Sequence, residues 1–230
     1  GGRLEIAAQE NGLVLVNELY LEDYLKKVVP SEMPASYEKE ALKAQAVCAR
    51  TYAYRQIQAN GYSQYGAHVD DSTTYQVYNN INTDSRTDSA VDETYGQILT
   101  YEGKPVEAFY FSTSCGATAD GSIWGGDPDA VPYLKSKLLG SNPNGYDLKN
   151  NVDFDNFIRD KSYKAYDSGY SLFRWETTTT SEILAEKVTG IGQVETIAVK
   201  SRGAGGIAKE LEITGSEGVK TINGQGQIRS

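Results

Sequence analysis

The chain has 230 residues, of which 39% are hydrophobic and 23% charged, and its formal net charge is −9. This composition is typical of a globular protein with a sizeable core, and it excludes the basic stripe that nucleic-acid binding requires. The acidic balance disfavours attraction to anionic membranes, and no apolar run approaches the roughly 18 residues that span a bilayer. We therefore expect no nucleic-acid partner, and membrane association only through an N-terminal anchor outside this sequence.

Two cysteines and one histidine limit the available chemistry. Cys48 and Cys115 are too few for a disulfide framework and lack the spacing of a metal site. His68 lies alone in a polar stretch, where a histidine is more often solvated than catalytic. Tyrosine is frequent, with 17 residues against 5 Phe, and suits sugar packing, although half-buried strand positions are its more common role. The sequence predicts neither a metal nor a cofactor.

The N-terminal region predicts a hairpin and then a helix. Strands are expected at 3–8 and 12–16, around the turn Glu10-Asn11-Gly12. Apolar residues then recur at helical spacing over 21–28. Pro30 is expected to end this helix, which leaves Glu32 in a stiff loop between two prolines.

A second, long helix is the most strongly patterned element. It is expected to start near Ser36, a good N-cap, and to stop at Gly61. Its buried stripe is expected to contain Leu42, Ala46, Ala49, Ala53 and Ile57.

The remaining pattern mixes short strands with short helices. Residues 140–170 are polar and are expected to form an excursion rather than a core element. Separate helices and hairpins predict an α+β fold, in one domain over 1–230, with a long central helix and antiparallel strands around a substrate groove. The second half of the polar stretch 61–82 alternates like a strand. Other expected elements are strands at 171–175, 194–200, 207–213 and 219–222, helices at 84–95 and 181–187, and a hairpin of 97–101 with 105–112 around Glu102-Gly103.

Glu32 is the main candidate for chemistry, since a stiff loop can hold a proton-transfer group within reach of a substrate. A solvated loop carboxylate is the more common alternative. Lys43 and Arg50 share one face of the long helix, where they could bind an acidic group or form an ordinary solvated face. The cluster Ser112-Thr113-Ser114 offers hydroxyls for sugar recognition, or forms a simple turn.

Longer runs of sequence resemble a known family. LYLEDYLKKVVPSEMPASYEKEALKAQAVCARTYAY, at 19–54, resembles the signature of the SpoIID/LytB domain, named for stage II sporulation protein D and an amidase-modifier protein. Further runs resemble the family's later blocks in the expected order: DDSTTYQVY (70–78), AVDETYGQILTYEGKPVEAFYFSTSCG (90–116), WGGDPDAVPYLKS (124–136), RWETTTTSEI and GIGQVETIAVKSRGAGGIAKELEITGSEG. The resemblance covers nearly the whole chain.

The resemblance implies a lytic transglycosylase that cuts peptidoglycan between N-acetylmuramic acid and N-acetylglucosamine and leaves 1,6-anhydro ends. Glu32 matches the catalytic glutamate of the S-E-M-P block. Lys43 and Arg50 match the Lys and Arg of the block L-K-A-Q-A-x-x-A-R, which is implicated in activity, and Ser112-Thr113-Ser114 matches a segment that lines the same groove.

The chain departs from one version of the family pattern, in which a Cys, a His and a second Cys bind zinc. Val69, Thr74 and Tyr75 stand at those positions, so we expect no zinc. The resemblance also places Cys48 and Cys115 near the groove. Two interpretations stay open: the two cysteines form a disulfide, or they are independent small buried residues.

Other functions stay open at this point. A hydrolysing muramidase would need a second carboxylate, such as Asp70 or Asp71, across the groove. A non-catalytic glycan-binding module that modifies an amidase, or a structural scaffold, would need none. The setting that the resemblance implies is extracytoplasmic wall remodelling during engulfment in sporulation, on glycan whose stem peptides an amidase or endopeptidase partner has removed.

Overall fold

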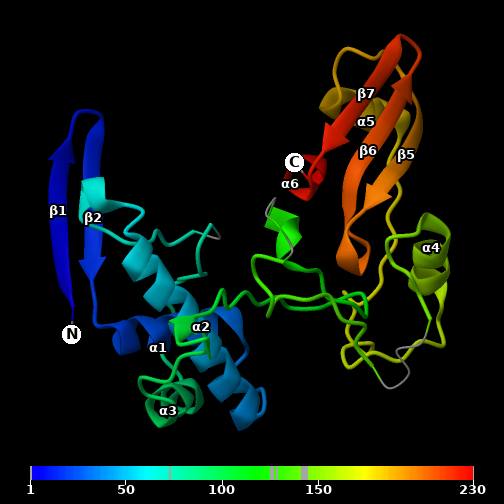
Figure 1. The fold of residues 1–230 in the computed structure, drawn as a ribbon. Coiled ribbons are helices and arrows are strands. Elements are labelled where there is room, and N and C mark those ends of the chain that lie inside the picture. The colour runs from blue at the N-terminus through cyan, green and yellow to red at the C-terminus, as the bar shows by residue number, and fades with distance from the viewer. Residues whose placement is uncertain (1, 73, 125–126, 128, 141–144, 230) are drawn as a thin grey trace. The chain divides into compact units, whose positions relative to one another are not determined.

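The computed structural model describes residues 2–72, 74–124, 127, 129–140 and 145–229 (Figure 1). The chain divides into two compact units, Gly1–Tyr110 and Phe111–Ser230, and each is described by itself. Helices and antiparallel sheets occur together, which confirms the α+β prediction. Among the described residues, no helix is both long and apolar enough to cross a membrane. The single domain and the substrate groove stay predictions.

The first unit begins with the predicted hairpin of β1 (Arg3–Gln9) and β2 (Gly12–Glu18). The register pairs Ile6 with Leu15, and alternation along each strand gathers the leucine and isoleucine side chains on one face. These side chains are 63% to 71% exposed: Leu4, Ile6, Leu13 and Leu15.

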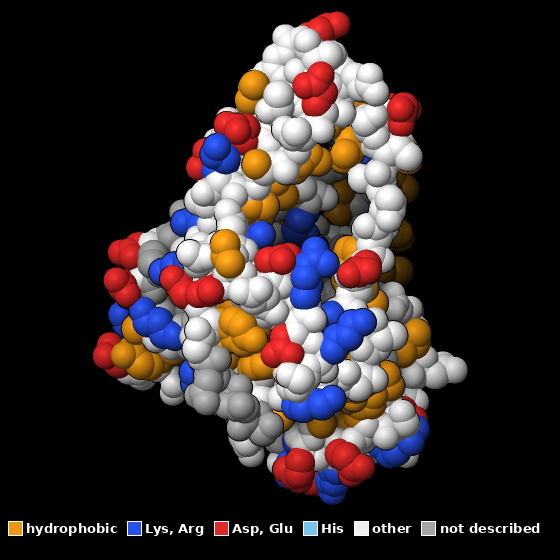
Figure 2. Space-filling view, turned by 90° about the vertical axis from the view of Figure 1, so that its right-hand side faces the viewer, with side chains coloured by type: hydrophobic (Ala, Val, Ile, Leu, Met, Phe, Trp, Pro, Cys, Tyr) orange, Lys and Arg blue, Asp and Glu red, His pale blue; other side chains and the backbone are white. Residues whose placement is uncertain are grey.

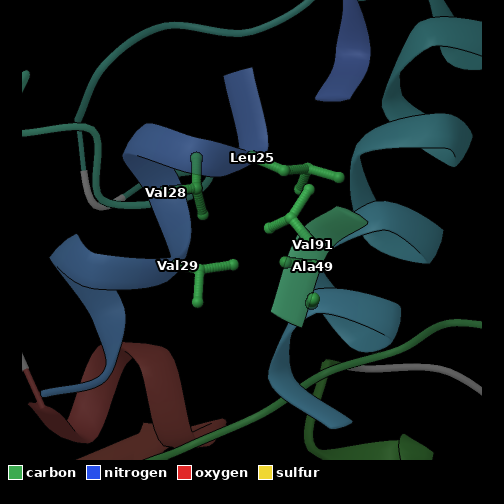
Figure 3. Close-up of a cluster of buried hydrophobic side chains, with 6 residues drawn as sticks. Leu25, Val28, Val29, Ala49 and Val91 are labelled. Atoms are coloured by element: carbon green, nitrogen blue, oxygen red, sulfur yellow. The ribbon is translucent and has the colours of Figure 1, made fainter. Parts of the chain in front are cut away.

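Three helices build the core of this unit: α1 (Leu21–Glu32), α2 (Lys39–Ala59) and α3 (Ser85–Glu93). Figure 3 shows the α1 side chains pointing toward Ala49 of α2 and Val91 of α3. Short alanine side chains on α2 let the neighbouring helices approach closely. The core residues are fully buried: Leu25, Val28, Val29, Ala46, Ala49 and Val91.

The prediction that Pro30 ends the first helix is wrong, because Pro30 lies inside α1. Proline lacks an N–H and so removes one backbone hydrogen bond, yet the helix continues and the Met33 N–H donates to the Val29 carbonyl at 2.9 Å. Glu32 is therefore the last residue of a helix and not part of a loop.

The long helix is confirmed, with two changes at its ends. It starts at Lys39 after Glu38, and not near Ser36. It ends before Asn60, whose φ of 52° is left-handed and closes the helix one residue earlier than the predicted Gly61.

The rest of the first unit is mostly irregular. Among the described residues, the strand predicted in the second half of 61–82 is not formed. Helix α3 begins as expected after Asp84, whose side chain accepts a hydrogen bond from the Arg86 N–H. The second hairpin is short, with β3 (Thr100–Tyr101) and β4 (Lys104–Pro105) around the predicted turn. A short 3₁₀ turn, η1, covers Ser63–Tyr65.

The second unit contains an antiparallel sheet in the order β5 (Val194–Arg202), β6 (Ala208–Gly215) and β7 (Gly218–Asn223). These strands and α5 (Ser181–Lys187) confirm the predictions for this region, whereas residues 171–175 form turns and not a strand. The remaining short elements are η2 (Gly121–Trp124), η3 (Ala204–Gly206) and α6 (Gln225–Arg229).

The polar stretch 140–170 supplies part of a core, which corrects the prediction of an excursion. It contains α4 (Asn151–Arg159), capped by the Asn150 side chain. Phe157 of α4 is fully buried and packs edge-on against Tyr146 and Tyr163. Widely spaced aromatic residues provide this apolar area, so the periodicity of the stretch does not reveal it.

Candidate functional site

Glu32 continues the core face of α1. Leu25, Val28 and Val29 are fully buried, and Glu32 follows three residues after Val29 and seven after Leu25. Residues at this spacing lie on one side of a helix, so the Glu32 side chain is directed along the packed face and is partly buried.

Two hydrogen-bond donors hold one oxygen of Glu32. The backbone N–H of Val77 donates to Oε1 at 2.8 Å, and the Tyr110 hydroxyl donates to the same oxygen at 3.2 Å. Among the described residues, Oε2 has no hydrogen-bond partner. Because the side chain is only partly buried, Oε2 is the oxygen that is open to solvent.

The segment that supplies Val77 is fastened along α1. The Asn79 N–H donates to Ser31 Oγ at 3.2 Å, and Lys27 Nζ donates to the Ile81 carbonyl at 2.8 Å. These two hydrogen bonds hold the segment in place without the strand-to-strand hydrogen bonds that the predicted strand would have formed. The segment thus delivers a backbone donor to Glu32 at a fixed position.

Behind Glu32 lies a chain of buried polar side chains. Gln76 is 1% exposed, and its Nε2 donates to the Ala49 carbonyl at 3.2 Å and to the Tyr110 hydroxyl oxygen at 3.0 Å. The Tyr24 hydroxyl donates to Gln76 Oε1 at 3.3 Å, and the Tyr24 ring stacks on Tyr78 with centroids 5.5 Å apart. Burial raises the pKa of Tyr24 and the pKa of Tyr110, so both are neutral phenols at physiological pH.

Our sequence interpretation missed Tyr24, Gln76 and Tyr110. The signal for Tyr110 was present, since Val106, Ala108 and Tyr110 alternate and the first two are buried. No such signal marks Gln76, because the pattern of its segment predicted a strand that does not form.

Arg50 is an internal residue of the first unit, and its role in binding substrate stays a prediction. Its side chain is 1% exposed, and its Nε and Nη2 each lie 2.8 Å from a different carboxylate oxygen of Glu22. The guanidinium also donates to the carbonyls of Val91 and Gln97. With its donors directed into the core, Arg50 joins helices.

Lys43 lies on the α3 side of α2. Its Nζ is 3.0 Å from Glu40 and 3.9 Å from Glu93, and the hydrogen bond to Glu40 raises the pKa of Lys43. It borders a shallow hollow together with Val47 and Leu99. A role for Lys43 in binding substrate stays a prediction.

The Ser112-Thr113-Ser114 cluster belongs to the second unit. The Ser114 N–H donates to Asp167 Oδ2 at 2.6 Å, and Arg174 Nε donates to the Cys115 carbonyl at 3.2 Å. Arg174 also lies 4.6 Å from the centre of the Phe157 ring. Asp167, from the stretch 140–170, and Arg174, which follows that stretch, therefore hold this loop. Its membership of one site with Glu32 stays a prediction.

Cys48 and Cys115 are free thiols, one in each unit, and a disulfide between them stays a prediction. Burial raises the pKa of each thiol. Among the described residues, no three His, Cys, Asp or Glu side chains are grouped to hold a metal. The face in Figure 2 shows acidic and basic side chains interspersed, without a continuous basic stripe.

The first unit therefore defines an α+β module that presents one partly buried carboxylate with a fixed oxygen and an open oxygen. Residues 9–101, which include Glu32, Lys43 and Arg50, match the family model of SpoIID, described as stage II sporulation protein. This match and the relatives below show that the chain is similar to the SpoIID family over part of its length.

Curated relatives carry names from both halves of the SpoIID/LytB domain name. Stage II sporulation protein D of Bacillus amyloliquefaciens is 42% identical over 135 residues, which are 53% of this chain and 39% of that protein. The amidase enhancer of Bacillus subtilis strain 168 is 44% identical over 114 residues, 49% of this chain and 15% of that protein. The chain thus spans about two fifths of the stage II sporulation protein D that it matches (39%).

Proposed function

We propose that the protein is a lytic transglycosylase that cleaves the bond between N-acetylmuramic acid and N-acetylglucosamine in peptidoglycan, with Glu32 as acid and base. The observation that supports this most is the asymmetry of Glu32: two donors occupy Oε1, whereas Oε2 is open. A carboxyl group held in this way keeps its orientation while it gains or loses a proton.

In the proposed reaction, Glu32 donates its proton to the glycosidic oxygen, and the bond from that oxygen to C1 of the muramic acid breaks. The carboxylate then takes the proton of the C6 hydroxyl of the same sugar. Oxygen O6 attacks C1 and closes the 1,6-anhydro ring, so the acid is regenerated. Because the nucleophile is part of the substrate, one carboxylate suffices where ordinary glycosidases need two.

The setting proposed with this activity is extracytoplasmic wall remodelling in sporulation and engulfment. The preferred substrate would be glycan without stem peptides, which an amidase or endopeptidase partner would supply. The sporulation names of the relatives support this setting.

The test compares the wild-type protein with Glu32→Gln on purified, peptide-stripped glycan strands, with products analysed by mass spectrometry. The substitution keeps an oxygen for the Val77 N–H but cannot transfer a proton, so the rate is expected to fall about 10² to 10⁴-fold. Glu18→Gln, on the exposed hairpin, is the control and is expected to retain activity.

Product mass separates the enzymatic alternatives. Anhydro ends support the transglycosylase, whereas products heavier by one water would identify a muramidase. Asp70 would then be the second carboxylate to test; hydrogen bonds from Ser72 and from Tyr62 lower the pKa of Asp70, so it is ionised at neutral pH.

A second candidate is a non-catalytic glycan-binding module that modifies an amidase. The name of the amidase enhancer relative favours it. Such a module would bind glycan equally well as wild type and as Glu32→Gln, and neither protein would release products. That result would overturn the proposed enzyme.

A further inference from the structure

The geometry points to Tyr110 as the positioning residue that holds Oε1 of Glu32 and leaves Oε2 as the atom that transfers the proton. This inference rests on the proposed function, because it assigns the reactive atom of the same site. It depends on which group donates in each hydrogen bond of the chain that runs from Tyr24 through Gln76 and Tyr110 to Glu32.

The contact with the Ala49 carbonyl determines the orientation of the Gln76 side-chain amide. A backbone carbonyl only accepts hydrogen bonds, so the Gln76 side-chain atom 3.2 Å from the Ala49 oxygen must be the amide nitrogen. The amide oxygen of Gln76 then faces Tyr24, whose hydroxyl must donate to it. The orientation of the buried amide is thereby fixed from both sides.

The fixed amide in turn fixes Tyr110. Gln76 Nε2 donates its other hydrogen to the Tyr110 hydroxyl oxygen at 3.0 Å. A phenol has only one hydrogen, and this hydrogen remains for Glu32 Oε1 at 3.2 Å. Tyr110 therefore acts on Glu32 as a donor in this arrangement.

Oε1 of Glu32 then faces two groups that donate, the Val77 N–H and the Tyr110 hydroxyl. A proton on Oε1 would weaken both bonds, since a protonated carboxyl oxygen is a poor acceptor. The proton is therefore carried by Oε2, which has no partner among the described residues. Both protonation states keep the same hydrogen bonds, so proton transfer requires no rearrangement behind the site.

The tyrosines and Asp70 around this chain of hydrogen bonds keep the same charge near neutral pH. Burial raises the pKa of Tyr24 on α1, of Tyr52 on α2 and of Tyr78. The pKa of Asp70 is lowered, mainly by the hydrogen bond from the Ser72 side chain, so Asp70 remains ionised. A change of the Glu32 NMR signal with pH would therefore report the protonation of Glu32 and not that of one of these neighbours.

The experiment is a titration of the side-chain carboxyl carbons by NMR in protein labelled at glutamate, with the Glu32 signal identified by its loss in Glu32→Gln. Tyr110→Phe removes one donor to the carboxylate, so the midpoint of the Glu32 titration is expected to rise by about one pH unit. Tyr52→Phe removes a hydroxyl on α2 that, among the described residues, makes no hydrogen bond to Glu32, and it is expected to leave the midpoint unchanged.

Gln76→Met provides a second variant that keeps the length of the side chain and removes its amide. It frees the Tyr110 hydroxyl to rotate, so a smaller rise in the same direction is expected. An unchanged midpoint in both Tyr110→Phe and Gln76→Met overturns the role of Tyr110.

The titration requires neither glycan nor activity, so it separates this inference from the proposed function. If wild type cleaves glycan, the alkaline limb of its pH–rate profile is expected to move upward in Tyr110→Phe by the same interval. A profile that stays in place while the midpoint moves overturns Glu32 as the titrating acid and preserves the hydrogen-bond chain.

Discussion

Arg50 and Glu22 form a two-point ion pair inside the first unit, with Nε and Nη2 each 2.8 Å from a separate carboxylate oxygen. The pair joins α2 to α1, and Arg50 also donates to the Val91 carbonyl of α3. A single guanidinium thus connects all three helices whose packing directs Glu32. The contacts of Arg50 are therefore those of a residue that holds the helices around Glu32 together.

Arg50→Met is expected to lower the free energy of unfolding by about 3 kcal/mol, because the carboxylate of Glu22 is left partly buried without its partner. Urea denaturation followed by circular dichroism measures the change. Arg159→Met breaks the exposed pair with Asp155 and is expected to cost much less than Arg50→Met, because solvent screens this pair. Equal losses in the two variants would contradict the structural role of Arg50.

Glu102→Asn is expected to stabilise the hairpin of β3 and β4 by about 1 kcal/mol. Glu102 has a φ of 49° and precedes Gly103 at 76°, and asparagine tolerates this left-handed conformation better than glutamate does. Denaturant midpoints of wild type, Glu102→Asn and Glu102→Ala provide the measurement. Alanine brings no such tolerance, so a gain of equal size with alanine would refute this explanation.

Asp84 is expected to make stability depend on pH in acid solution. The hydrogen bonds from the Arg86 side chain and from its backbone N–H lower the pKa of Asp84 to about 2. A lowered pKa stabilises the fold above the unfolded value of about 3.9, and this contribution disappears as the pH falls through about 2.

Asp84→Asn keeps an N-cap oxygen but removes the charge. The difference in unfolding free energy between wild type and Asp84→Asn is therefore expected to shrink from pH 5 to pH 2. Thermal unfolding at each pH provides the comparison. A difference that stays constant across this range would show that the charge of Asp84 contributes nothing.

Asp167→Ala is expected to weaken glycan binding about tenfold, if Ser112-Thr113-Ser114 contacts the sugar. The Asp167 carboxylate accepts the Ser114 N–H at 2.6 Å, and losing a charged hydrogen bond of this kind releases the loop. Binding to peptide-stripped glycan can be measured by calorimetry. Asp155→Ala, on the exposed face of α4, is the control. Equal glycan affinities of Asp167→Ala and Asp155→Ala would show that the loop is not part of the binding site.

Regular patterns in the sequence predicted the elements that local signals determine. The helix 39–59 and the strands β5, β6 and β7 follow from periodicity and turn residues. Pro30 misled the prediction because packing at Val28 and Val29 outweighs one lost hydrogen bond. The burial of Phe157 depends on aromatic residues far apart in the chain, which no local window detects.

The candidate site was predictable in part. Glu32 was selected through the S-E-M-P resemblance, although the i, i+3, i+4, i+7 spacing with Leu25, Val28 and Val29 already marks it as a continuation of a buried face. The contacts of Gln76 with Ala49 and Tyr110 join three distant segments, and such contacts exist only after folding. The burial of Arg50 was not predictable, because helical spacing alone does not distinguish a solvated face from a buried one.

The placement of Glu32 on the packed face of α1 has a thermal consequence. A carboxylate on a loop can lose its alignment by local fraying well below the melting temperature of a protein. Glu32 is instead the end of a helix whose preceding turns are the core itself. We therefore expect its alignment to persist on heating until the three helices separate, and any activity that depends on Glu32 to be lost together with cooperative melting of the first unit.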